Sequence, residues 1–369
     1  MDKKKNTTLI VILVAAAMII VAAGVIGLSV YMEQRKESGN PDKTATGTAA
    51  QTKAKVTTSE DGEVVDYEQS GILKLGNYVG IEVDVEPTED DVLYAMEDDL
   101  ASMTKDHKGK IQEGDYVCVT YKGSIDGEEY EELSGESEVL RVGDYYMGEE
   151  FEKSLIGKQP GDKVSVSVTY DDSYEELEDE TVDYKITIKG RFDDYYANKF
   201  SEGKYPTVKE YIDYVTETLR AENKTPEMAG ESAWDSVIED SEVLEYPEGL
   251  VEEETVNTQK QYEDYAEVVG ASYEDLLEQF GMNEDDLQMV AQDTVKDRLV
   301  GKTIMAKENL VLDDASYEKY LREAMEEDDD ELTLEELEQQ YKEGYGNHPK
   351  DDMMIYFVQE FVGGKAKTE

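Results

Sequence analysis

Cysteine, histidine and tryptophan are scarce in this sequence, which has one cysteine, one tryptophan and two histidines. The single cysteine, Cys118, excludes a disulfide bond within the chain. Zinc sites and histidine-based catalytic triads need clusters of Cys, His or Asp, so His107 and His348 leave almost no material for either. We therefore expect no cofactor and no metal, and hydrolase chemistry is disfavoured.

Basic residues are also scarce, because 36 Lys and Arg stand against 89 Asp and Glu and give a net charge of -53. Proteins that bind nucleic acid need clustered Lys and Arg to displace counterions from the phosphate backbone, so we expect no nucleic acid partner. The acidity is expected to keep the protein soluble, with loose collection of divalent cations as the alternative. The apolar fraction of 39% still allows hydrophobic cores, and 369 residues suffice for two modest domains.

One long run, from Leu9 to Val30, carries no charge. Its 22 residues would span about 33 Å as a helix, enough to cross a hydrocarbon layer of about 30 Å. Lysines at positions 3–5 precede the run and its other flank is nearly balanced in charge, which predicts an inner N-terminus and an outer body. The alternative is a cleaved signal peptide, whose apolar core is usually about 7 to 15 residues. Residues 38–60, rich in Thr, Ala, Gly, Ser and Lys, predict a flexible tether.

The middle of the chain has a sequence period of two. Apolar and polar residues alternate over 116–121, and Asp126-Gly127 is a hairpin-type turn. Because Cys118 lies in this run, we expect a buried strand residue rather than a reactive thiol. Further strands are predicted at 138–142, 163–170 and 181–189, and one short helix is predicted at 149–156. The pattern predicts a small antiparallel sheet wrapped on one short helix.

Three segments of this region carry a recognisable pattern: the run Gly114–Tyr130, the helical segment Phe151–Lys158 and the turn Pro160–Lys163. They resemble the FKBP-type prolyl isomerase domain as it occurs in trigger factors, and the spacing agrees with that family to about Lys189. The resemblance implies an FKBP-like fold and prolyl cis-trans isomerase activity. This reaction breaks no covalent bond, because its barrier of about 20 kcal/mol is the partial double-bond character of the amide.

The resemblance also implies a prolyl pocket, in which a dry aromatic cup strips water from the imide carbonyl and lowers the barrier. Phe151 falls at its floor, and Gly148 falls where a backbone N–H receives the substrate carbonyl. The other implied site residues are the aromatics Tyr121, Tyr130, Tyr174 and Tyr184, the apolar walls Leu140 and Met147, and Glu131, which stands where FKBPs often carry Asp. The alternative for the aromatics is an ordinary core position in a small β domain.

One segment departs from the family pattern. Where trigger factors commonly show a Phe-Ile-Pro-Gly-Phe type sequence, this chain has Met147-Gly148-Glu149-Glu150-Phe151. Two carboxylates, Glu149 and Glu150, are therefore expected beside the pocket rim, and we expect catalysis to be weak. The sequence leaves open two other functions, a non-catalytic holdase that kept the fold and an acidic envelope scaffold.

Beyond Asp193 the period becomes helical. Residues 207–210 form a capping-box sequence, and apolar residues recur on one helical face from Val208 to Leu219. The segment Glu245–Glu254 resembles the C-terminal domain of trigger factors. The resemblance implies helical arms that hold unfolded chains. The ribosome-binding domain of that family is missing, since the apolar run and tether occupy its place, so no ribosome-binding segment is expected.

These features predict an α+β fold, with an FKBP-like antiparallel β-sheet and one short helix inserted in or flanked by an elongated all-α chaperone domain and preceded by a transmembrane helix. The predicted parts are a cytoplasmic N-terminus (1–8), a transmembrane anchor (9–31), a flexible tether (32–70), a connector (71–110), the FKBP-like domain (111–192), the trigger factor C-terminal-like helical domain (193–364) and a tail (365–369). Expected partners are the membrane and unfolded, secreted or proline-containing client polypeptides. We expect a single-pass cell membrane protein whose body lies on the extracytoplasmic side.

Overall fold

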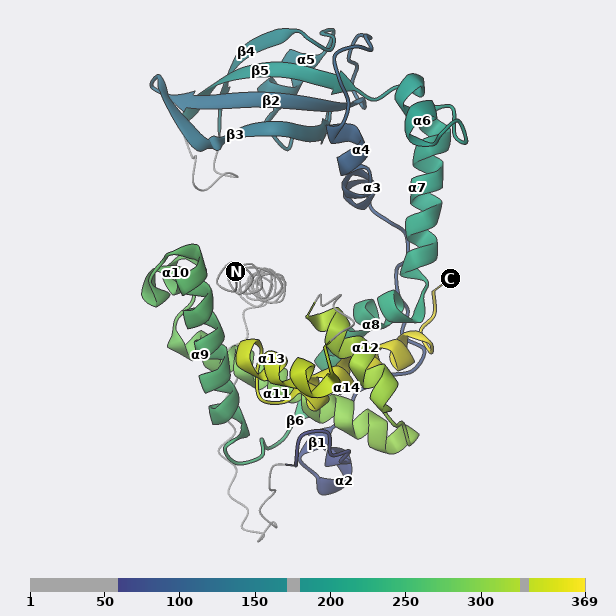
Figure 1. Ribbon diagram of the computed structural model, residues 1–369, viewed down its shortest axis with the longest axis vertical. Helices are drawn as coiled ribbons and strands as arrows, with labels where there is room; N and C mark the ends of the chain where they lie inside the picture. Colours follow the sequence, from purple (N-terminus) through teal and green to yellow (C-terminus); the bar gives the residue numbers. More distant parts are fainter. Residues whose placement is uncertain (1–58, 171–179, 326–331, 369) are drawn as a thin grey trace. The chain divides into compact units, whose positions relative to one another are not determined.

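The computed structural model describes residues 59–170, 180–325 and 332–368, except for the side chains of Glu131 and Glu132 (Figure 1). Contacts divide the chain into two compact units, one of residues 84–224 and one built from the described residues up to 83 together with 225–368. The predicted anchor at 9–31 lies outside the described residues. Within the described ranges, no helix is long and apolar enough to cross a membrane.

The unit of residues 84–224 contains a four-stranded antiparallel sheet with strand order β3-β2-β5-β4 (Figure 1). Its strands are β2 Tyr116–Ile125, β3 Glu128–Arg141, β4 Lys163–Thr169 and β5 Thr181–Arg191, and the short helix α5 spans Glu149–Leu155. The β2–β3 hairpin turns at Asp126 and Gly127, whose φ values of 52° and 87° suit the short turn that this sequence predicts. The predicted antiparallel sheet with one short helix is confirmed.

Both faces of the sheet are covered. On one face, Val117, Val119 and Ile188 pack with Phe151 and Leu155 of α5 in one hydrophobic core. On the other face, Tyr116 and Cys118 pack against helices of the same unit. Cys118 is fully buried in β2, so the expectation of a buried strand residue is confirmed. Burial raises the pKa of its thiol to about 11, which disfavours the reactive thiolate.

Four helices of this unit surround that second core: α3 Glu89–Ala95, α4 Glu97–Ala101, α6 Asp194–Phe200 and α7 Val208–Asn223. The capping box predicted at 207–210 is present, because the Thr207 side chain accepts from the Glu210 N–H and the Glu210 carboxylate accepts from the Thr207 N–H. Tyr196 and Tyr211 pack in the same core as Leu100 and Met103. Helices that precede and follow the predicted isomerase segment therefore belong to the same unit as its sheet. The predicted domain boundaries at 110/111 and 192/193 assign these helices to other parts of the chain.

The second unit is mostly helical. Its elements are α2 Tyr67–Ser70, β1 Leu73–Lys74, α8 Pro226–Asp240, β6 Glu242–Val243, α9 Leu250–Val269, α10 Tyr273–Gln279, α11 Glu284–Glu308, α12 Asp314–Ala324, α13 Leu334–Gly344 and α14 Pro349–Gly363. The short strands β1 and β6 pair antiparallel, and the Val83 N–H donates to the Lys367 carbonyl oxygen (3.0 Å). Chain segments from before and after the sheet-containing unit thus build one unit together.

Helices α8 and α14 approach closely at two glycines. A Cβ atom at Gly230 would lie 2.0 Å from the Gln359 carbonyl oxygen, and one at Gly363 would lie 1.8 Å from the Pro226 carbonyl oxygen. Real side chains do not tolerate such distances, so any larger residue at either position would push the two helices apart.

Two buried cations on α11 lie at the centre of this unit. The Arg298 guanidinium contacts Glu254 of α9, and its Nε lies 2.7 Å from Oδ1 of Asp352 on α14. The Lys302 Nζ lies 2.7 Å from Oδ2 of Asp351 and donates to the Ser59 Oγ (2.7 Å). Because both cations are 3% to 4% exposed, they depend on these oxygens to replace water.

We expect Arg298→Met to destabilise the helical unit by about 3 to 5 kcal/mol, because it leaves two carboxylates without their buried partner. Arg220→Met is the matched control, since Arg220 pairs with the mostly exposed Glu86 and Glu217 and its loss should cost far less stability. Chemical denaturation followed by circular dichroism measures both. Equal losses in the two variants would contradict the central role of Arg298.

The Asp297 carboxylate on α11 makes the stability of this unit depend on pH. Its Oδ1 accepts a hydrogen bond from Trp234 Nε1 on α8 (3.0 Å), while burial, with smaller effects of Asp293 and Asp235, raises its pKa to about 7. Since the pKa is higher in the folded chain, the Asp297 contribution to stability should grow as pH falls from about 7 toward 4. Asp297→Asn should therefore stabilise the protein more at pH 8 than at pH 5, as measured by thermal unfolding. A constant difference between these pH values would contradict the raised pKa.

Candidate functional site

Three of the predicted site aromatics meet in one cluster. They are Tyr121 of β2, Phe151 of α5 and Tyr184 of β5, and their rings contact one another edge to face. The ring centroid of Tyr121 lies 5.6 Å from that of Phe151 and 5.7 Å from that of Tyr184, and the centroids of Phe151 and Tyr184 are 5.1 Å apart. They meet because β2 pairs directly with β5 and α5 packs on this face of the sheet. We call Tyr121, Phe151 and Tyr184 the aromatic cluster. Such edge-to-face contacts contribute about 0.5 to 1.5 kcal/mol each beyond burial.

The predicted apolar walls also belong to this core. Leu140 is 3% exposed, and Met147 is partly buried against the same residues as the aromatic cluster. Phe151 is 0% exposed and Tyr184 is 2% exposed, so most of the cluster is shielded from solvent. Tyr121 and Met147 retain partial exposure and form its accessible part.

Gly148 takes a conformation that suits glycine. Its φ is 92°, and a Cβ atom there would lie 2.9 Å from Val168 Cγ1. The Gly148 N–H donates to the Tyr145 carbonyl oxygen (2.9 Å). The predicted role of this N–H, receiving a substrate carbonyl, would therefore require that turn to open.

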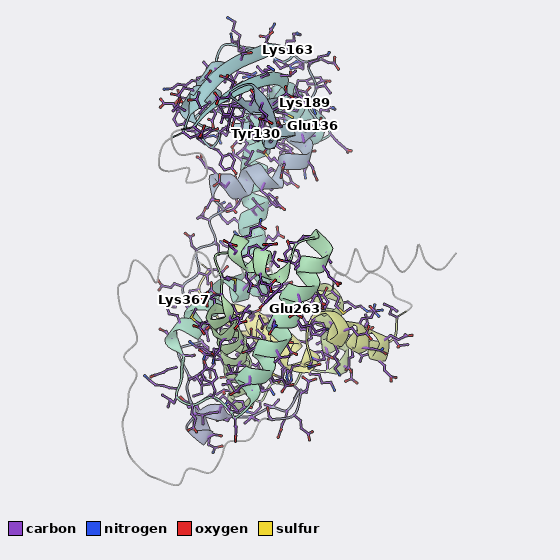
Figure 2. All side chains as sticks on the ribbon, turned by 90° about the vertical axis from the view of Figure 1, so that its left-hand side faces the viewer. Tyr130, Glu136, Lys163, Lys189, Glu263 and Lys367 are labelled. Atoms are coloured by element: carbon purple, nitrogen blue, oxygen red, sulfur yellow. The ribbon has the colours of Figure 1, made fainter. Side chains whose placement is uncertain are left out.

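Tyr130, labelled in Figure 2, is the most exposed predicted site aromatic among those that the structure describes, with 39% of its surface exposed. Gly123 of β2 is the register partner of Tyr130 on β3 and of Tyr184 on β5. Residues in register on adjacent strands point to the same face of a sheet, so Tyr130 lies on the face that carries the aromatic cluster. Tyr174 and the side chain of Glu131, also predicted site residues, lie outside the described part of the chain.

Two buried polar residues beside the cluster were not predicted. Tyr170 is 5% exposed, and its hydroxyl lies 2.8 Å from the Tyr184 hydroxyl and 3.4 Å from the Met147 carbonyl oxygen. The alternating sequence pattern could have indicated that Tyr170 is buried, because it follows the buried Val164 and Val168 at even spacing.

Glu152 is the other residue that the sequence does not reveal. It is 0% exposed, and one carboxylate oxygen accepts from the N–H groups of Gly143 (2.7 Å) and Tyr145 (2.9 Å), while the other accepts from Met147 (3.4 Å). These bonds hold the loop that carries Met147 and Gly148. A glutamate in an acidic helix start predicts an exposed residue, so only the structure shows this positioning role.

The two carboxylates expected at the rim are exposed. Glu149 pairs with Lys153 one helical turn away, and the Lys153 Nζ lies 5.8 Å from the centre of the Tyr145 ring. Glu150 is exposed on the first turn of α5. Negative charges at a helix N-terminus interact favourably with the helix dipole, and this interaction is a sufficient structural reason for both glutamates.

The sheet, the short helix and the aromatic cluster are those of an FKBP-type domain: residues 107–189 match the family described as FKBP-type peptidyl-prolyl cis-trans isomerase. The chain is 30% identical over 275 residues to the trigger factor of Halothermothrix orenii, covering 68% of this chain and 63% of that protein. It is 27% identical over 316 residues to the trigger factor of Alkaliphilus oremlandii, covering 80% and 73% respectively. A solved trigger factor chaperone structure is similar with 18% identity and a TM-score of 0.33, covering 80% of this chain and 73% of that one.

The chain is thus trigger factor-like and carries an FKBP-type isomerase domain, which confirms the resemblance seen in the sequence. It spans about 63% to 73% of the length of the two trigger factors named above.

We expect Glu152→Ala to loosen the loop over residues 143–148, because three N–H donors lose their buried acceptor. A loss of about 1 to 3 kcal/mol is expected from thermal unfolding, with faster hydrogen exchange at Gly143 and Tyr145. Glu149→Ala, the same truncation at an exposed position of α5, is the control and should change neither. Unchanged exchange in Glu152→Ala would contradict the positioning role.

Proposed function

We propose that this protein catalyses prolyl cis-trans isomerisation in polypeptide chains. The observation that carries this proposal is the aromatic cluster of Tyr121, Phe151 and Tyr184 inside a segment that matches the FKBP-type isomerase family. An apolar seat with little water favours the twisted imide, whose carbonyl loses conjugation and hydration in the transition state. Tyr130, Tyr121 and Met147 supply the surface through which a proline side chain would contact this cluster.

We further propose a chaperone activity toward unfolded or secreted polypeptides. Similarity to trigger factors extends over about 275 to 316 residues and therefore beyond the isomerase segment. The helical unit leaves several large apolar side chains exposed, among them Leu244 (54%), Val256 (66%) and Val311 (77%). Exposed apolar surface is what a chaperone needs to hold an unfolded chain.

The location proposed for these activities is the outer side of a cell membrane, with residues 9–31 as a single-pass anchor. The uncharged run and the lysines at positions 3–5 support this location. A cleaved signal peptide would lead to the same side of the membrane without the anchor.

A non-catalytic holdase is the second candidate function. The near-complete burial of Phe151 and Tyr184, together with the internal hydrogen bond of the Gly148 N–H, favours it. In that case the isomerase fold would persist as a packed core, without a seat open to proline.

Proline-limited refolding of a reporter protein, with the full-length chain in detergent micelles, separates the two candidates. We expect acceleration by the wild type and a loss of about 2- to 10-fold in kcat/KM for Tyr130→Leu, the value of one aromatic contact. Tyr94→Leu is the matched control, because Tyr94 is 80% exposed on α3 of the same unit and should leave the rate unchanged.

The outcomes assign the function. A wild type that suppresses aggregation without accelerating refolding would be a holdase, and one that does neither would be a scaffold. Equal activity of Tyr130→Leu and wild type would remove Tyr130 from the site.

The proposed topology predicts that the intact protein sediments with membranes and that protease added to intact cells, stripped of any wall, removes the body. The charge asymmetry around residues 9–30 is the reason. A cytoplasmic protein of the same cells serves as the control for membrane integrity. Protection of the body under conditions that leave the membrane sealed would contradict the proposed orientation.

A further inference from the structure

Three potential metal ligands from opposite ends of the chain meet in the helical unit. Asp61 lies in a turn within the predicted tether (32–70), whose residues 59–70 belong to the helical unit instead. His348 is the N-cap residue of α14, and Asp351 lies in the first turn of that helix. One carboxylate oxygen from each aspartate and one ring nitrogen of His348 all lie within 4.8 Å of one another.

The imidazole of His348 lacks the hydrogen bonds that a shielded ring normally makes. Its side chain is 15% exposed, but both ring nitrogens are out of contact with solvent and neither makes a hydrogen bond to a described residue. Shielded polar atoms without a partner are costly, and a metal ion is one partner that would satisfy a ring nitrogen. The Nε2 atom lies 3.5 Å from Oε1 of Glu253, which leaves Nδ1 for a metal. A carboxylate behind the second ring nitrogen is the usual way in which proteins orient a metal-bound histidine.

The charges around the cluster also favour a cation. Lys302 pairs with Asp351, and Arg298 pairs with Glu254 and Asp352. In the part of the chain that the structure describes, no Lys or Arg pairs with Asp61 or Glu253. A divalent cation would balance these two remaining negative charges.

We propose that Asp61, His348 and Asp351 bind one divalent transition metal ion, with Zn²⁺ as the best match. A nitrogen ligand with carboxylate oxygens suits Zn²⁺, whereas Ca²⁺ and Mg²⁺ prefer oxygen ligands alone. Zinc bonds of about 2.0 to 2.2 Å place tetrahedral ligand atoms about 3.5 Å apart, so the three side chains need to close in by about 1 Å. Water would fill the fourth position.

The metal would hold the turn that contains Asp61 against α14. Asp351 already receives the Gly62 N–H (2.7 Å), and the Asp351 N–H donates to Asp61 Oδ1 (3.0 Å), so the same two segments are held in place before any metal binds. The sequence hides this site because its ligands are far apart in the chain and the fold alone brings them together. This inference does not rest on isomerase activity.

The test uses the full-length chain, stripped with a chelator and titrated with Zn²⁺ by calorimetry. We expect one tight site per chain and a higher unfolding temperature with Zn²⁺. His348→Gln and Asp61→Asn should weaken binding by more than about 100-fold, and Glu253→Gln, which removes the carboxylate behind the ring, by about 10- to 100-fold. His107→Gln is the matched control, because His107 is the other histidine and also lies beside a carboxylate, 2.7 Å from Asp193.

Two further measurements keep the test decisive. Far-ultraviolet circular dichroism of each variant without metal shows whether it is folded, and visible absorption of bound Co²⁺ reports nitrogen and oxygen coordination directly. Loss of the Co²⁺ spectrum in folded His348→Gln and its retention in His107→Gln would support the site. Zinc affinity in the wild type no higher than in His348→Gln, or equal loss in His107→Gln, would overturn it, since weak binding to surface carboxylates is shared by all variants.

Discussion

The buried cations Arg298 and Lys302 of α11 are the interaction on which the helical unit depends. They lie one helical turn apart and meet carboxylates from α9 and α14, and Lys302 also reaches Ser59 and the Glu60 carbonyl oxygen. Because the unit is assembled from residues before 84 and after 224, these contacts join chain segments that the other unit separates. Removing water from two cations is costly, so the surrounding oxygens specify one arrangement rather than merely adding stability.

A different requirement governs the FKBP-type unit. Its aromatic cluster needs to be dry to favour a twisted imide, yet a substrate needs a way to reach it. Phe151 and Tyr184 meet the first requirement through burial, while Tyr130, Tyr121 and Met147 retain the exposure that the second requires. Glu152 supports this edge by holding the loop that carries Met147. The balance between burial and access separates an isomerase from a holdase with the same fold.

Local sequence patterns predict the parts of the fold that depend on neighbouring residues. The Asp126-Gly127 turn, the capping box at 207–210 and the alternating strand over 116–121 follow from short-range backbone chemistry. The family resemblance predicts that Tyr121, Phe151 and Tyr184 lie together, because it carries the register of the sheet.

Long-range pairings and buried charges could not be predicted in this way. Composition assigns Glu152 and Lys302 to the surface, and only the fold supplies the N–H groups and carboxylates that allow their burial. The grouping of α3 and α4 with α6 and α7 depends on packing such as that between Leu100 and Tyr196, residues far apart in the chain. The predicted anchor, residues 9–31, lies outside the described residues, so its prediction comes from the sequence.

The most direct test of the central claim is exchange spectroscopy by nuclear magnetic resonance on a short peptide with one proline. The spontaneous exchange between its cis and trans forms takes about 10 to 100 s, too slow to give exchange cross-peaks. We expect a catalytic amount of the full-length protein to produce such cross-peaks between the two forms, and we expect them to vanish when denaturant unfolds the FKBP-type unit at the same temperature. Absence of exchange with folded protein at any concentration would contradict the claim that this chain is a prolyl isomerase.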